Sequence, residues 1–157
     1  MSLGENRKLD MLIAEKVFGY QVEVIKPDWY KFDVYLFKDV ERDCYIYSLD
    51  ENACNAMMYR NGVDARDGTL PPLPRYSIAD SADFTYLHEP MLMRHGARIH
   101  YYCNPRGAKV VYGVQIIRAS KELPKVCYGE EGEDMAQALC LSIKRFFEIL
   151  EWERELI

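Results

Sequence analysis

Apolar residues recur with helical spacing near the start of the chain. The pattern predicts a first helix over residues 6–18, with charged residues between the apolar ones. Its apolar face is formed by Leu9, Leu12, Ile13 and Val17. Gly19 follows, and glycine readily adopts the left-handed conformation in which many helices end. A short strand over residues 20–25 is expected next.

A longer amphipathic helix is predicted over residues 133–153. Its apolar positions fall on one face of a 3.6-residue repeat. They are Met135, Leu139, Ile143, Phe146, Phe147 and Leu150. Glu133 and Asp134 stand at the predicted N-terminus, where the helix dipole favours negative charge.

Between these helices, apolar and polar residues alternate in paired short runs, a pattern typical of antiparallel hairpins. A first hairpin is predicted over residues 32–37 and 44–49. A second is predicted over residues 97–103 and 108–118, joined across the turn Asn104–Gly107. Helices and hairpins in this order favour an α+β fold, in which an antiparallel sheet is layered with helices, including the amphipathic C-terminal one.

Ser77 and Asp80 have the spacing of a capping box, in which side chains satisfy free N–H groups at a helix start. We therefore predict a helix from about Ile78. Pro90 is expected to end or kink it, because proline removes a helical hydrogen bond and clashes with the preceding turn. Gly96 closes the segment.

The length of 157 residues predicts a single domain spanning residues 1–157. Within it, residues 50–62 are expected to form a short helix and residues 63–75 a loop. The net charge of −5 argues against general nucleic-acid binding, which usually shows as a basic excess.

Cysteine usage and hydropathy indicate the compartment. The five cysteines are an odd number without paired spacing, which is typical of a reducing environment. We expect no signal peptide, and no apolar stretch approaches the roughly 20 residues that cross a membrane. A cytoplasmic protein without a membrane partner is therefore expected.

Three segments occur in the same order in a known family. They are Leu9–Tyr20, a helix that ends in Gly-Tyr; Tyr76–Phe84, with a Tyr-Ser start; and Asp134–Lys144, rich in Ala and Leu. On these segments the chain resembles the phage ABA sandwich family, over residues 9–20 and 76–150. Residues 30–62 look like an insertion relative to short members, and Phe84 stands where a tryptophan would be expected.

The resemblance implies a phage or prophage origin and an α/β/α layered sandwich. It also implies a location in the cytoplasm of an infected or lysogenic bacterial host. The family carries no agreed activity, so the resemblance assigns a role to no residue of this chain.

No run of residues specifies a catalytic chemistry. His88 and His95 lack the one-turn spacing that puts two imidazoles on one helix face, and no cysteine pair has zinc-site spacing. The chain has no Gly-x-Ser-x-Gly nucleophile elbow. The acidic stretch 130–134 is interpreted as a solvated loop that leads into the last helix. We therefore predict no catalytic residue, no metal and no cofactor, and a protein that is not an enzyme.

The second hairpin contains one constellation that suits ligand binding. If Cys103 pairs with Ala108, one face presents cationic and aromatic groups, and Gly113 opposite Arg98 leaves room for a ligand. Such groups together can bind a phosphate and stack on a base. The predicted ligand-binding residues are Arg98, His100, Tyr102, Arg106 and Lys109. The alternative is the ordinary solvated side of a half-buried hairpin.

The leading hypothesis is a phage- or prophage-encoded, non-enzymatic binding protein. It would sequester a small anionic, nucleotide-like ligand or block a host defence protein. An alternative is a protein–protein interaction or assembly module without a ligand, and a more distant one is an uncharacterised enzyme. Because Phe146 and Phe147 are adjacent, both are not expected to reach the centre of one core. Phe147 and Trp152 are therefore predicted to contact a second copy of the chain in a homo-oligomer.

Overall fold

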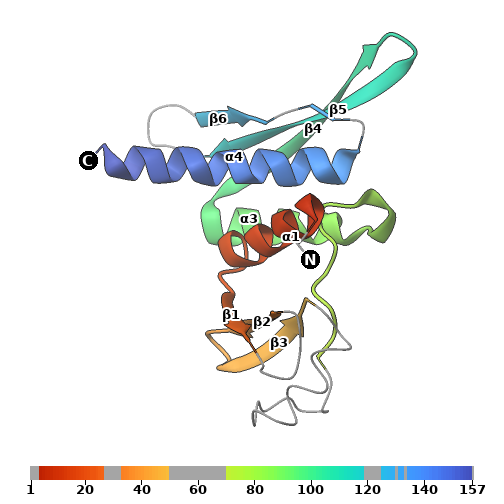
Figure 1. The fold of residues 1–157 in the computed structure, drawn as a ribbon. Coiled ribbons are helices and arrows are strands. Elements are labelled where there is room, and N and C mark those ends of the chain that lie inside the picture. Colours follow the sequence, from red (N-terminus) through yellow and green to blue (C-terminus); the bar gives the residue numbers. More distant parts are fainter. Residues whose placement is uncertain are drawn as a thin grey trace. The chain divides into compact units, whose positions relative to one another are not determined.

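The computed structural model describes residues 4–26, 33–49, 70–118, 125–129, 131–132 and 134–156 (Figure 1). The chain divides into two compact units, one within Gly19–Pro74 and one that combines Leu3–Phe18 with Arg75–Ile157. The predicted α+β class is confirmed, since the described residues form three helices and two antiparallel three-stranded sheets. The helix predicted for residues 50–62 lies outside the described residues.

The smaller unit is a sheet with strand order β1-β2-β3. Its strands are β1 (Gln21–Ile25), β2 (Val34–Asp39) and β3 (Cys44–Ser48). The first predicted hairpin is confirmed as β2 and β3, and these strands belong to the described part of the predicted insertion at residues 30–62. The central strand β2 supplies buried residues on both faces: Val34, Leu36 and Phe37. Beyond β3, the N–H of Leu73 donates to the main-chain oxygen of Ser48 at 2.7 Å.

The larger unit packs helices against a second sheet, with strand order β4-β5-β6. Its helices are α1 (Glu5–Lys16), α3 (His88–His95) and α4 (Met135–Glu155); its strands are β4 (Ala97–Arg106), β5 (Lys109–Arg118) and β6 (Lys125–Tyr128). Figure 1 shows α4 running along one side of this sheet, with α1 and α3 beyond α4. The core between these layers includes Ile13, Met91, Ile116 and Leu139, all fully buried. Among the described residues, each helix is too short or too polar to cross a lipid bilayer.

Two layers enclose α4, and this arrangement explains why adjacent phenylalanines are both inside. Phe146 and Phe147 are 4% and 8% exposed. Phe146 lies on the side of β6, whereas the ring of Phe147 meets the His95 ring of α3 edge-on at 4.9 Å. The expectation that Phe147 lies on an open flank is therefore wrong, because a helix between two layers has two buried faces.

Ser77 bonds residues of α1 and does not cap a helix that follows it. Its hydroxyl donates to the main-chain oxygen of Asn6 at 3.1 Å, and its N–H donates to the buried carboxylate of Asp10 at 2.9 Å. Neither the predicted capping box nor the helix from Ile78 forms, because tertiary partners on α1 take the groups that a cap would use.

The segment before α3 instead contains two short 3-10 turns, Ala79–Ser81 and Asp83–Leu87. Because α3 begins at His88, Pro90 lies in its first turn, where a helix has no N–H bond to lose. Pro90 therefore occurs in the first turn of a helix, whereas the sequence predicted that it would end or kink one. Gly96, with φ of +62°, ends α3 as expected.

Candidate functional site

Strands β4 and β5 form a longer hairpin than predicted. Their pairing continues to Arg106 and Lys109, so the turn consists of Gly107 and Ala108 alone. Cys103 pairs with Tyr112, not with Ala108. The predicted register is therefore wrong by four positions.

Pro105 is the reason for the difference. Proline usually leaves a strand, which favoured a turn at Asn104–Gly107. Here Pro105 pairs with Val110 inside the hairpin. Strand β4 lies at the edge of its sheet, where proline is tolerated because the missing N–H costs no ladder bond.

The corrected register keeps each side chain on its predicted face, because strand side chains alternate with a period of two and four is an even number. Arg98, His100 and Tyr102 share one face of β4. What changes is the residue opposite each of them: Ile117 opposite Arg98, Gln115 opposite His100, and Gly113 opposite Tyr102. Gly113 therefore makes room beside Tyr102, not beside Arg98.

At the base of the hairpin, this face carries polar side chains that bond no other described residue. Arg98 and His100 are exposed, and Gln115 is half-buried. No hydrogen bond or ion pair joins these three side chains to another residue that the structure describes. The described helices lie on the other side of the sheet (Figure 1). We call Arg98, His100 and Gln115 the basal cluster.

Next along the face, the ring of Tyr102 covers Gly113. A Cβ atom placed on Gly113 would lie 2.1 Å from Cζ of Tyr102, so only glycine permits this approach. The ring thus packs across the neighbouring strand, with its other side turned away from the backbone of β5.

Toward the tip, the same face holds a carboxylate of the chain itself. The guanidinium of Arg106 donates to Oε2 of Glu131 at 3.0 Å. The hydroxyl of Tyr102 and the amide of Asn104 each lie 3.4 Å from Oε1 of Glu131. Three donors of β4 therefore converge on one anion.

Main-chain bonds hold Gly132, the residue after Glu131, beside β5. Gly132 and Tyr112 exchange two hydrogen bonds of 2.7 Å and 2.9 Å. The sequence pattern gave no sign of this pairing, since a glutamate in an acidic run looks like a solvated residue. Only the fold shows that Glu131 is a partner of the hairpin.

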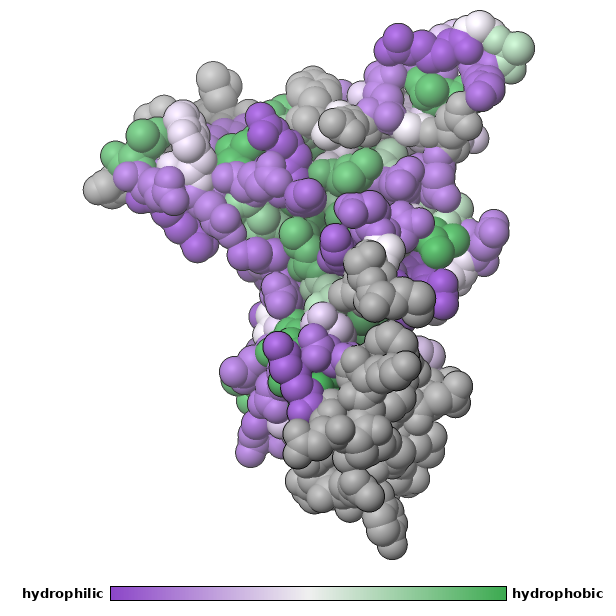
Figure 2. All heavy atoms as spheres, in the orientation of Figure 1, coloured by the Kyte–Doolittle hydropathy of each residue, from purple (hydrophilic) through white to green (hydrophobic). Residues whose placement is uncertain are grey.

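The five predicted ligand-binding residues thus fall into three groups. Arg98 and His100 bond no other residue in the described ranges, whereas Tyr102 and Arg106 are bonded to Glu131. Lys109 is exposed opposite Arg106 at the turn. Figure 2 shows the end of the hairpin, at upper right, covered mainly by hydrophilic residues.

Of the two predicted oligomer contacts, one is accessible. Trp152 is 61% exposed near the end of α4, and Leu156 is 67% exposed four residues later. Phe147 is buried beneath His95 and is not accessible to a partner.

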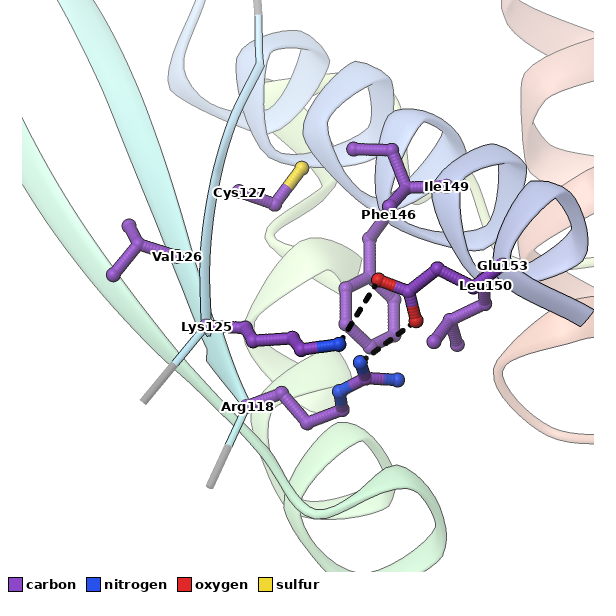
Figure 3. Close-up of a pocket in the computed structure, with 8 residues that line it drawn as sticks. All are labelled: Arg118, Lys125, Val126, Cys127, Phe146, Ile149, Leu150 and Glu153. Carbon is purple, nitrogen blue, oxygen red and sulfur yellow. Dashed lines mark hydrogen bonds and ion pairs between the residues drawn. The ribbon is translucent and has the colours of Figure 1, made fainter. Parts of the chain in front are cut away.

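A pocket of about 310 Å³ opens between β6 and the C-terminal half of α4 (Figure 3). At its polar end, Arg118 and Lys125 bond the carboxylate of Glu153 at 2.9 Å and 3.3 Å. The hydrogen bond from Arg118, with a further contribution from Lys125, lowers the pKa of Glu153. The apolar lining consists of Cys127, Phe146, Ile149 and Leu150, with Val126 at the strand. The pattern did not predict this pocket because β6 has only four residues, too few for a recognisable alternation.

The histidines of α3 are bonded to the main chain. His88 Nδ1 lies 3.3 Å from the oxygen of Thr85, and His95 Nε2 lies 3.1 Å from the oxygen of Val17. Within the described ranges, no three His, Cys, Asp or Glu side chains gather in a group that could hold a metal ion.

Comparison with protein-family models, with curated proteins and with solved structures finds no match to this chain.

Proposed function

We propose that this chain is a non-enzymatic binding protein that holds a small anionic, nucleotide-like ligand at the basal cluster and Tyr102. The observation that supports this most directly is the state of Arg98 and His100. Both are exposed on the same side of one strand, and neither bonds another described residue. A ligand could therefore bind them without breaking a contact with another described residue.

These side chains supply complementary contacts for a phosphate and a base. Residues two apart on one side of a strand are separated by about 7 Å, a suitable spacing for successive groups of a nucleotide. Arg98 offers a planar fork for phosphate oxygens, and the imidazole of His100 offers a ring N–H donor. The ring of Tyr102, packed over Gly113, is the aromatic group of this face on which a base would stack.

Glu131 restricts which anions fit. Its negative charge already occupies the donors of Arg106, Asn104 and Tyr102. A second anionic group near the tip would be repelled, whereas an uncharged base over Tyr102 would not. The site is thus suited to a ligand with its phosphate at Arg98 and its base toward the tip.

The biological part of the proposal comes from the resemblance to the phage ABA sandwich family. A phage or prophage protein in the host cytoplasm can act against defence by sequestering a nucleotide-derived signal. A host defence protein docked on the same face is the other partner we consider.

Thermal-shift titrations with AMP, ATP, cyclic di-AMP and cyclic di-GMP test the ligand. A nucleotide at 100 times its Kd should raise the free energy of unfolding by about 2.7 kcal/mol. Arg98→Ala should abolish this gain and change the unliganded stability by less than about 0.5 kcal/mol, as expected for an exposed residue. Arg154→Ala removes the same charge from an exposed position on α4 and should keep the full gain.

Three outcomes would contradict the proposal. The absence of any shift with all four nucleotides would exclude this ligand class. Equal responses of Arg98→Ala and Arg154→Ala would place the ligand elsewhere. A large loss of unliganded stability in Arg98→Ala would show that the arginine is structural.

A second candidate function is a protein–protein interaction or assembly module. Trp152 and Leu156 lie one helical turn apart and are both more than half exposed, so they form a continuous apolar strip. A second copy of the chain is the partner that we consider for this strip.

A further inference from the structure

We propose that the pocket between β6 and α4 is a second binding site, for a small amphipathic acid with one carboxylate and a short apolar chain. Its strand residues Arg118, Lys125 and Cys127 face α4, whereas Arg98 and His100 project from the opposite face of the sheet. The two sites therefore share no residue and can be tested separately.

The charges at the pocket favour a single negative charge on the ligand. Arg118 and Lys125 share one carboxylate, since each bonds a different oxygen of Glu153. The neighbouring pair on α4, Arg145 and Glu148, is balanced within itself at 3.6 Å. Among the pocket residues that the structure describes, two cations therefore face one carboxylate, an excess of one positive charge.

Burial distinguishes the two cations. The side chain of Arg118 is 25% exposed and that of Glu153 is 29% exposed, whereas that of Lys125 is 58% exposed. A ligand carboxylate would meet Lys125, the more accessible cation and the one with the longer bond to Glu153. Arg118 would keep Glu153 in place beneath it. Figure 3 shows both cations directed toward Glu153 at the same end of the pocket.

The remaining walls are apolar and shape the rest of the ligand. Phe146 and Cys127 are almost fully buried, and Ile149 and Leu150 are half-buried. Burial also raises the pKa of the Cys127 thiol, so this side chain stays neutral beside the acid. The volume of about 310 Å³ lies at the lower end of the range of about 300–1,000 Å³ for small-molecule sites. Each methylene that the pocket buries should improve affinity about fourfold.

NMR titration of the ¹⁵N-labelled protein with sodium octanoate and with octan-1-ol tests the role of the cations and the role of the apolar walls. The two probes have the same chain length and differ in charge. Octanoate should shift amide signals in Lys125–Cys127 and Ile149–Glu153, and it should bind about fivefold more tightly than octan-1-ol. Lys125→Met should remove this preference and leave octan-1-ol binding unchanged.

Two further variants complete the design. Glu153→Gln removes the competing carboxylate and should tighten octanoate binding about fivefold. Lys144→Met makes the same change as Lys125→Met at an exposed position of α4 that does not line the pocket, and should alter neither affinity.

The proposal is overturned if octanoate leaves the pocket signals unchanged at millimolar concentration or shifts only signals elsewhere. It is also overturned if octanoate and octan-1-ol bind equally, since the cations would then have no role. The same conclusion follows if Lys125→Met and Lys144→Met have the same effect on octanoate.

Discussion

At the scale of single residues, Tyr101 departs from the rule that buried polar atoms are hydrogen-bonded. Its side chain points toward the helices, and its ring meets the His88 ring edge-on at 5.4 Å. Its hydroxyl is buried and has no hydrogen-bond partner among the described residues. Burial raises the pKa of Tyr101 to about 12, so the phenol remains neutral at physiological pH.

Tyr101→Phe should therefore stabilise the protein by about 1 kcal/mol, because it removes a desolvated hydroxyl and keeps the ring. Urea denaturation measures the change. Tyr86→Phe makes the same substitution on a residue that is 71% exposed and should leave the stability unchanged. A loss of stability in Tyr101→Phe would show that the hydroxyl has a partner, such as a buried water.

The candidate site shows which residue-level features a sequence can predict. The face of the sheet on which each side chain lies was predictable. Arg98, His100 and Tyr102 are two positions apart along β4, and an even shift of register leaves them on the same face. The residue opposite each of them on β5 was not predictable, because Pro105 lies inside the strand and not in the turn. The contact of Glu131 with Arg106 was not predictable either, since the two residues are far apart in sequence and only the fold joins them.

At the scale of elements, α4 depends on the side chain of Asp134. This carboxylate accepts hydrogen bonds from the N–H groups of Ala136 and Gln137 at 2.8 Å and 3.2 Å. Asp134→Ala should lower the free energy of unfolding by about 1 kcal/mol, because these N–H groups lose their partner. Asp134→Asn keeps an N-cap oxygen and should lose much less. Thermal or urea unfolding of the three proteins checks the order, and equal losses in both variants would contradict a capping role.

Elements were predictable where a pattern repeats over many residues. The long apolar face of α4 and the alternation in β4 and β5 each contain enough repeats to indicate their structure. A short segment such as β6, with four residues, gave no such signal. At Ser77 the local pattern predicted a helix cap, but the residue bonds Asn6 and Asp10 on α1 instead. There, long-range partners outweigh local preference.

At the scale of the whole molecule, we predict a homo-oligomer that buries the Trp152–Leu156 strip. A large exposed aromatic side chain stabilises an interface strongly when a partner covers it. Light scattering at micromolar concentration should give a multiple of 18.4 kDa for the wild type and 18.4 kDa for Trp152→Glu. Met93→Glu changes another exposed apolar residue, on α3, and should keep the larger mass. A wild-type mass of 18.4 kDa would contradict the prediction.

The larger unit is interrupted in sequence, and this affects the order in which it can form during synthesis. Helix α1 packs on α4, yet all of Gly19–Pro74 and the second sheet are translated between them. At about 5–20 residues per second, α4 follows α1 after roughly 6–24 s. During that interval Ile13, Ala14 and Val17, which are fully buried in the finished fold, have no α4 to cover them. A nascent chain halted before α4 therefore presents the apolar stripe of α1 to chaperones and proteases.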